Sequence, residues 1–333
     1  MQDWHEIVFS EELDFESKTR KVFDYQFEHN PVYRRFCEAL GYGTDRFETP
    51  PLLPIRAFKD ARVVTIEEDS ESGNQHSEFF FQSSGTGNMK RSRHIVADIS
   101  LYRSSLLKGF RHFYDLGQSV IWGYTPGYAD NPHSSLVWMV RELIEQAGSG
   151  LSRFLPLGKP IDAKALRAVE ESGKKLILFG AAFGLIDLAE QAELNLPSGS
   201  TVIETGGMKT YRREITRAEL HRRLAEGFGV LPHQVHSEYG MAELLSQAYA
   251  TGGKWFRTVP WMQVSIRNPD NPEEILPSFY EGVIGITDLA NIHSCSFILT
   301  GDRGVMDKKG RFQVLGRWNP KDLRGCNFLI EED

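Results

Sequence analysis

Short apolar segments alternate with helical patterns along the middle of the chain, and this alternation constrains the fold more than any other feature. Residues 120–122, 174–180, 201–204 and 235–238 are short, apolar and bounded by turn residues, as buried strands are. Strands that alternate with helices favour right-handed crossovers and a mostly parallel sheet with helices on both faces. We therefore predict an α/β fold.

The helices between these strands carry capping signals. Asp98 precedes an apolar stripe as an N-cap does, and Thr216 is followed three residues later by Glu219, which is capping-box spacing. A third helix is predicted from Ser134 to Gln146, and a fourth begins at Phe183. Gly148 follows the third helix, and Gly227 and Gly229 lie near the end of the helix that begins at Thr216, where helices commonly end.

The two ends of the chain differ from this middle part. Two helical stripes occupy residues 15–40, and prolines at positions 50, 51 and 54 predict an extended linker after them. After Trp255 the pattern changes to short strands and turns. We expect a helical segment at residues 1–60, an α/β nucleotide-binding core at 61–254, a smaller β-rich subdomain at 255–316 and a hinge-like tail at 317–333.

Composition excludes several classes of protein. With 333 residues, 41% hydrophobic and 25% charged, the chain is an ordinary globular protein. Its formal net charge of -7 disfavours nucleic-acid binding, and no apolar run is long enough for membrane insertion. Three cysteines cannot form a disulfide framework, and the acidic N-terminus lacks a signal-peptide pattern, so we expect a cytoplasmic protein.

Four unusual segments lie at predicted strand ends, where ligands bind in open α/β sheets. Each combines glycine with hydroxyl, carboxylate or aromatic side chains. The segments are residues 83–90, 204–207, 237–243 and 299–304. Each one alone is also compatible with an ordinary turn, so only the combination points to a site.

The residue types in these segments suit different parts of ATP. Hydroxyls, glycines and the basic residues that follow suit a triphosphate in 83–90, although the P-loop pattern is missing. The paired glycines of the second segment allow the backbone to lie flat against adenine. Tyr239 could stack on a base, Glu243 could hold Mg²⁺ and Asp302, in a predicted turn, could accept both ribose hydroxyls. Arg317 could reach the ribose or the α-phosphate.

Two histidines lie next to these segments. His94 follows the first segment, and His236 immediately precedes the third. Either could line a substrate pocket. The alternative is a hydrogen-bonded structural histidine, and the sequence shows no zinc spacing.

The order Ser-Ser-Gly-Thr, Gly-Gly, Tyr-Gly-x-x-Glu, Thr-Gly-Asp and Gly-Arg resembles the adenylate-forming superfamily of acyl-CoA synthetases, peptide-synthetase adenylation domains and firefly-type luciferases. Residues 237–247, the Asp-Leu-Ala-Asn stretch at 288–291 and the tail with Arg-Gly-Cys-Asn at 324–327 resemble more closely the LuxE family of acyl-protein synthetases. The resemblance runs from about Phe79 to the end of the chain. It implies the large N-terminal domain of that superfamily, with the C-terminal lid domain absent or vestigial.

By this resemblance the protein activates a long-chain fatty acid with ATP and Mg²⁺, forms an acyl-adenylate and passes the acyl group to a protein thiol. A reductase or carrier protein would be the acyl-transfer partner. The resemblance implies that the phosphate loop consists of Ser83, Ser84, Gly85 and Thr86, and that Gly206 and Gly207 lie on the adenine side. It implies that Tyr239 is the stacking aromatic, with Glu238 and Gly240 as its nucleotide-binding neighbours, and that Glu243 is the Mg²⁺ carboxylate. Asp302 and Arg317 would bind ribose and phosphate, and Cys326 would accept the acyl group.

Cys326 has features of a reactive thiol without reference to any family. It lies between Gly325 and Asn327, with Lys321 and Arg324 nearby, and nearby cations favour the thiolate. The alternative is an inert buried cysteine in a terminal strand. Cys37 and Cys295 lie in apolar patterns and are expected in the core.

The sequence also departs from the family pattern. The phosphate loop reads Ser-Ser-Gly-Thr-Gly-Asn, where the family prefers Ser-Ser-Gly-Thr-Thr-Gly, and Ala242 replaces the usual threonine before Glu243. Both changes predict a weaker grip on phosphate. The catalytic lysine of the missing lid domain would be replaced by Lys90, Arg91 or a group of a partner subunit.

Two other functions are also compatible with the sequence. An acyl- or aryl-CoA ligase of the phenylacetate type would transfer the acyl group to coenzyme A instead of a protein thiol. A non-catalytic nucleotide-binding subunit would explain the two departures in phosphate-contacting motifs.

Overall fold

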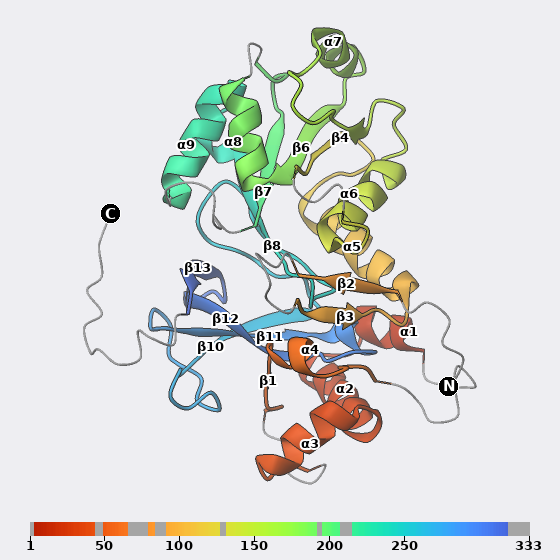
Figure 1. The fold of residues 1–333 in the computed structure, drawn as a ribbon, viewed down its shortest axis with the longest axis vertical. Helices are drawn as coiled ribbons and strands as arrows, with labels where there is room; N and C mark the ends of the chain where they lie inside the picture. The colour runs from red at the N-terminus through yellow and green to blue at the C-terminus, as the bar shows by residue number, and fades with distance from the viewer. Residues whose placement is uncertain are drawn as a thin grey trace.

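Two β-sheets meet near the middle of the molecule, with helices packed around them (Figure 1). The computed structural model describes residues 3–43, 49–65, 79–83, 91–126, 131–191, 195–206 and 215–318. Among the helices of these residues, none combines the length and apolarity that a membrane span requires. The α/β class predicted from the sequence is confirmed.

The larger sheet has six strands in the order β5-β4-β6-β7-β8-β9. Every neighbouring pair is parallel except β8 with β9, which is antiparallel. Four of these strands were predicted from their apolar runs to within two residues at each end. The bounds are β4 Ser119–Tyr124, β5 Arg153–Phe154, β6 Lys175–Ala181, β7 Thr201–Thr205, β8 Val235–Tyr239 and β9 Ala248–Ala250.

Successive residues of these strands face different apolar clusters. Trp122 and Leu178 belong to the cluster with α8 and α9, whereas Ile121 and Ile177 belong to the cluster with α5 and α6. Both faces are therefore buried, which is why the strands read as continuous apolar runs. The helices are α5 Ile99–Phe113, α6 Ser135–Gln146, α7 Ala163–Glu171, α8 Ala182–Glu190 and α9 Arg217–Phe228.

The predicted caps are also confirmed. Asp98 accepts hydrogen bonds from the backbone N–H groups of Ser100 and Leu101 at the start of α5. Thr216 caps α9, which ends at Gly229 in the left-handed conformation with φ 64°. These local signals are sufficient to fix the helix ends because they satisfy backbone groups that no helix can pair internally.

The second sheet has the order β1-β12-β11-β10, and β13 pairs with β12. All its pairs are antiparallel except β1 with β12. The strands expected after Trp255 are thereby confirmed. The bounds are β1 Leu53–Pro54, β10 Met262–Arg267, β11 Glu281–Asp288, β12 Phe297–Met306 and β13 Phe312–Arg317, with the 3-10 turn η2 Leu289–Asn291 between β11 and β12.

Two local expectations are wrong in this sheet. Asp302 does not lie in a turn at a strand end, because β12 continues to Met306 and pairs Asp302 with Arg317 of β13. The proline segment is not only a linker, since Leu53 and Pro54 form a strand parallel to β12. Long-range pairing decided both cases, and proline is tolerated on an edge strand.

The N-terminal helices pack on the second sheet. They are α1 Trp4–Phe9, α2 Phe15–His29, α3 Pro31–Ala39 and α4 Ala57–Asp60. Buried Gln26 of α2 donates to the carbonyls of Asn291 and Ile292 and accepts from Ser296 N–H. The remaining elements are the two-stranded sheet β2 Phe80–Gln82 with β3 Arg93–Ile95 and the 3-10 turn η1 Pro232–Gln234.

Replacing Gln26 with alanine should destabilise the fold by at least ~2 kcal/mol, because two buried carbonyls and one N–H lose their partner. Urea unfolding monitored by circular dichroism measures this change. The control is Gln118→Ala, at an exposed position, which should change the free energy of unfolding by less than ~0.5 kcal/mol. Equal effects of the two substitutions would contradict the assigned role of Gln26.

Candidate functional site

Tyr239, Asp302 and Arg317 come together where the two sheets meet. The Tyr239 hydroxyl donates to Asp302 Oδ2 at 2.9 Å, and Arg317 Nε lies 3.1 Å from Asp302 Oδ1. Asp302 is 6% exposed, whereas the Arg317 side chain is 53% exposed. Burial and the Asp302 carboxylate raise the pKa of Tyr239, so its hydroxyl remains protonated and can donate. The cluster therefore presents a paired carboxylate with an arginine open to solvent.

Glu243 lies next to this cluster, in the segment between β8 and β9. Ser92 Oγ donates to Glu243 Oε1, and Ser83 Oγ accepts from Ser92 N–H at 3.1 Å. Burial raises the pKa of Glu243, while the Ser92 hydrogen bond and the positive charges of Arg317 and Lys59 oppose that change. The first and third predicted segments thus meet through Ser92.

The end of β7 lies beside the end of β8. Thr205 is the register partner of Glu238, and its hydroxyl donates to Glu238 Oε2. Gly206 follows with φ 85°, a conformation that favours glycine. Gly240 has no Cβ, and one placed there would collide with Glu238 Oε1. Gly206 therefore suits the turn after β7, and Gly240 leaves room for the Glu238 carboxyl group.

Burial raises the pKa of Glu238 to about 7, and the nearby Glu204 adds to this effect against the Thr205 hydrogen bond. Glu204 is itself buried and lies 3.5 Å from His221 Nε2 and 3.9 Å from Arg217 Nε. The guanidinium of Arg217 stacks over Phe256 at 4.8 Å. Several buried carboxyl groups therefore converge on the strand ends, each with its own partner.

The two predicted histidines have hydrogen-bond partners outside the Asp302 cluster. His94 is fully buried, with Nδ1 2.8 Å from the Ala242 carbonyl oxygen and Nε2 2.9 Å from Asn291 Oδ1. His236 Nδ1 lies 3.0 Å from the Tyr114 hydroxyl on the α5 side of the sheet. Burial lowers the pKa of both histidines to about 4. His94 has the contacts of a structural histidine, and the substrate roles of both histidines stay predictions.

Several predicted residues fall outside the part of the chain that the structure describes. Their roles stay predictions from the sequence. They are Ser84, Gly85, Thr86, Lys90, Gly207 and Cys326. Cys37 and Cys295 are buried as expected, and burial raises the pKa of Cys37 to about 12.

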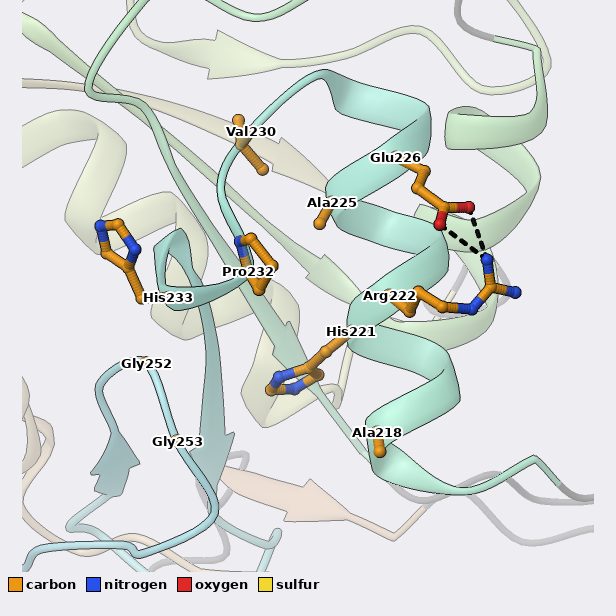
Figure 2. Close-up of a pocket in the computed structure, with 10 residues that line it drawn as sticks. All are labelled: Ala218, His221, Arg222, Ala225, Glu226, Val230, Pro232, His233, Gly252 and Gly253. Carbon is orange, nitrogen blue, oxygen red and sulfur yellow. Dashed lines mark hydrogen bonds and ion pairs between the residues drawn. The ribbon is translucent and has the colours of Figure 1, made fainter.

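A separate pocket of about 560 Å³ lies along α9, between this helix and the turn at Gly252 and Gly253 (Figure 2). His221 and His233 are part of its lining, and none of the predicted site residues is. His221 Nε2 reaches Ser237 Oγ at 3.0 Å, so one side chain connects this pocket with β8.

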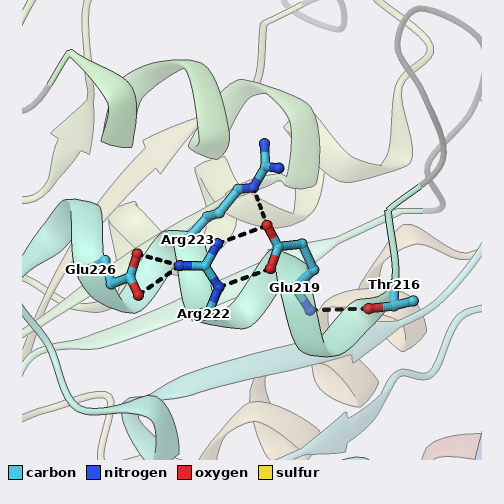
Figure 3. Close-up of polar contacts among 5 residues, drawn as sticks. All are labelled: Thr216, Glu219, Arg222, Arg223 and Glu226. Atoms are coloured by element: carbon cyan, nitrogen blue, oxygen red, sulfur yellow. Dashed lines mark hydrogen bonds and ion pairs between the residues drawn. The ribbon is translucent and has the colours of Figure 1, made fainter. Parts of the chain in front are cut away.

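The exposed side of α9 carries a chain of ion pairs (Figure 3). Glu219 pairs with Arg222 and Arg223, and Arg222 pairs also with Glu226. The two arginines lower the pKa of Glu219 to about 2. These contacts support the helix that places His221 and Arg217 against the strand ends.

Sequence reasoning missed Ser92, Thr205 and Asn291 as members of the site. Thr205 lies within the second predicted segment, but no pattern distinguishes its hydroxyl. Asn291 belongs to the Asp-Leu-Ala-Asn stretch, whose only signal in the sequence is the family resemblance. Ser92 carries no sequence signal, because only the β2–β3 pairing brings it to Glu243.

The chemistry of these side chains fits a nucleotide with a metal ion. Glu243 offers a hard carboxylate oxygen of the kind that Mg²⁺ prefers. Asp302 offers acceptors for hydroxyl groups, and the exposed guanidinium of Arg317 offers donors for hydroxyl or phosphate oxygens. The described residues are therefore compatible with ATP and Mg²⁺.

Comparisons with known proteins agree with this fold. The profile of a family described as acyl-protein synthetase, LuxE, matches residues 160–333, slightly more than half of the chain. The chain is 23% identical over 338 residues to a Vibrio harveyi protein named long-chain-fatty-acid–luciferin-component ligase, and the match covers 93% of this chain and 85% of that protein.

Solved structures of adenylate-forming ligases are also similar. A 2-hydroxyisobutyryl-CoA ligase in complex with 2-HIB-AMP and CoA matches with TM-score 0.63 and 15% identity, over 92% of this chain and 68% of that one. ATP-bound MatB from Rhodopseudomonas palustris matches with TM-score 0.51 and 14% identity, over 72% of this chain and 47% of that one. The chain thus covers about half the length of MatB, and the fold is that of the adenylate-forming ligases.

The raised pKa of Glu238 predicts a pH-dependent cost of burial. Because its pKa rises from 4.5 to about 7 on folding, the native state binds more protons than the unfolded state between these values, and stability falls as pH rises through this window. Glu238→Gln removes this cost. Its free energy of unfolding relative to the unsubstituted protein should therefore increase by up to ~3 kcal/mol between pH 5 and pH 8. Urea unfolding at both values tests this, and a difference that does not vary with pH would contradict it.

Proposed function

We propose that this chain, which belongs to the LuxE family of acyl-protein synthetases, uses ATP and Mg²⁺ to activate a long-chain fatty acid and transfers the acyl group to a protein thiol. The name of the Vibrio harveyi relative supports a long-chain fatty acid as substrate. A thiol acceptor requires a reducing compartment, such as the cytoplasm.

One observation carries the proposal. Tyr239 is far from Asp302 and Arg317 in the sequence, yet the three residues form one hydrogen-bonded cluster beside Glu243. Three of the sequence motifs that resemble nucleotide ligands therefore meet at one place. A set of unrelated turns would not be expected to converge in this way.

The residues suit the first step, in which a carboxylate oxygen of the fatty acid attacks the α-phosphate of ATP. The bond to the β-phosphate breaks, pyrophosphate leaves and an acyl-adenylate forms. Asp302 would hold the ribose, Tyr239 would stack on the base, and the positive charge of Arg317 would stabilise the phosphate or ribose oxygens. Glu243 would hold Mg²⁺, which neutralises phosphate charge.

In the second step the thiolate of Cys326 would attack the acyl carbonyl carbon, AMP would leave, and a thioester would form. A reductase or carrier protein would then accept the acyl group. Coenzyme A as direct acceptor is the alternative, and it predicts thioester formation that does not require Cys326.

Asp302→Asn keeps the shape of the side chain but removes its charge. It should raise the KM for ATP by roughly 10- to 100-fold, because hydrogen bonds to a charged group are worth about 1.5–3 kcal/mol. Fatty-acid-dependent exchange between ATP and labelled pyrophosphate measures this. Asp307→Asn is the matched control, since Asp307 also pairs with an arginine, Arg311, in the turn between β12 and β13. An unchanged KM in Asp302→Asn would contradict the ribose role.

Cys326→Ser should abolish a hydroxylamine-labile acyl label on the protein and leave pyrophosphate exchange intact, because only the acceptor of the second step is removed. Labelled palmitate with ATP, followed by gel analysis, shows the label. Cys37→Ala is the control, since Cys37 is buried, and it should keep the label. A label that survives Cys326→Ser would refute the acceptor role, and a thioester formed only with added coenzyme A would support the alternative.

A further inference from the structure

The segment that carries Glu243 is held by side chains from other parts of the chain. Residues 240–247 connect β8 to β9 and belong to no helix or strand. Inside the segment, Leu244 N–H donates to the Met241 carbonyl at 3.1 Å. Among the described residues, the other hydrogen bonds of its backbone involve the side chains of Asp288, Asn291 and His94, all of them at least 90% buried.

Asp288 holds the end of the segment. Its Oδ2 accepts from the N–H groups of Leu245 at 2.8 Å and Ser246 at 2.9 Å, and its Oδ1 accepts from the Ser246 hydroxyl at 2.6 Å. The same carboxylate caps the turn η2 by accepting from Ala290 N–H at 3.2 Å. One buried carboxylate therefore ties this segment to the turn between β11 and β12.

Asn291 and His94 hold the part around Glu243 itself. Asn291 Nδ2 donates to the carbonyl oxygen of Glu243 at 2.8 Å and to that of Cys295 at 2.9 Å. Its Oδ1 faces His94 Nε2, and the other ring nitrogen of His94 contacts the Ala242 carbonyl. The peptide groups on both sides of the Glu243 Cα are thus fixed, while Ser92 fixes its carboxylate.

We propose that Asn291, supported by Asp288 and His94, is a positioning residue that sets the direction of the Glu243 side chain for Mg²⁺. This inference rests on the proposed function, because it takes Glu243 as the metal carboxylate. Metal ligands need oriented support, since a small displacement of the carboxylate changes the coordination geometry. The Asp-Leu-Ala-Asn stretch therefore acts through Glu243 and does not itself touch the nucleotide.

Asn291→Asp tests the proposal, because it keeps the shape of the side chain and the oxygen that faces His94 but replaces the donor that binds Glu243. It should lower kcat for pyrophosphate exchange and raise the Mg²⁺ concentration for half-maximal rate, each about tenfold, with the KM for the fatty acid unchanged. Hydrogen–deuterium exchange of the ligand-free protein should show faster uptake in a peptide that covers residues 241–247. Asp288→Asn, which keeps one acceptor oxygen, is the second variant and should show the same changes. It serves as the test if Asn291→Asp does not fold.

Asn30→Asp is the matched control. Asn30 is also fully buried and donates through Nδ2 to the Ser294 carbonyl at 2.7 Å. Within the described residues, none of the hydrogen bonds of its side chain reaches the 240–247 segment. It should destabilise the protein without changing the Mg²⁺ requirement.

Three results would decide the matter. The proposal would be overturned if Asn291→Asp changed the Mg²⁺ requirement and the deuterium uptake of residues 241–247 no more than Asn30→Asp does. The proposal would be supported if Asn291→Asp and Asp288→Asn, but not Asn30→Asp, changed both the Mg²⁺ requirement and this deuterium uptake. If the unsubstituted protein shows no exchange with any fatty acid, the proposed function fails, and deuterium uptake alone then decides whether Asn291 positions the Glu243 segment.

Discussion

The buried carboxylate of Asp302 is the interaction on which the candidate site depends, because it joins the two sheets. It accepts from Tyr239 of the parallel sheet and pairs with Arg317 of its own sheet. A carboxylate this buried is stable only when its charge is compensated, so the partners cannot separate without a large desolvation cost. The Tyr239 end of β8 is thereby held beside β12.

The other buried carboxyl groups of the site pose a second constraint, since a polyanion such as ATP would be repelled by several bare negative charges. The negative charge of each carboxyl group is compensated or reduced in a different way. Asp302 is paired with Arg317, and Glu204 lies near His221 and Arg217. Glu238 has a pKa of about 7 and is therefore partly neutral at physiological pH. Glu243 is left as the carboxylate whose charge a divalent cation could compensate.

Sequence reasoning predicted the local features of the fold well and the long-range ones poorly. Strand β6 and the caps of α5 and α9 follow from apolar runs and capping residues, which act over a few positions. The continuation of β12 through Asp302 depends on pairing with β13, and the Thr-Gly-Asp pattern alone does not distinguish this strand from a turn. In the candidate site, motif order singles out Tyr239 and Asp302, whose roles stay predictions, whereas Ser92 reaches Glu243 only through tertiary contacts.

The support of Glu243 also explains why the N-terminal part of the chain belongs to the site, although the family profile matches only residues 160–333. A residue beyond a strand end has no ladder hydrogen bonds to hold it, so its position must come from elsewhere. Ser92 and His94 provide contacts from one side. Gln26 of α2 donates to the Asn291 carbonyl, and Asn291 in turn holds the Glu243 peptide. A chain reduced to its parallel sheet would keep the strand ends but lose the contacts that give this carboxylate a defined direction.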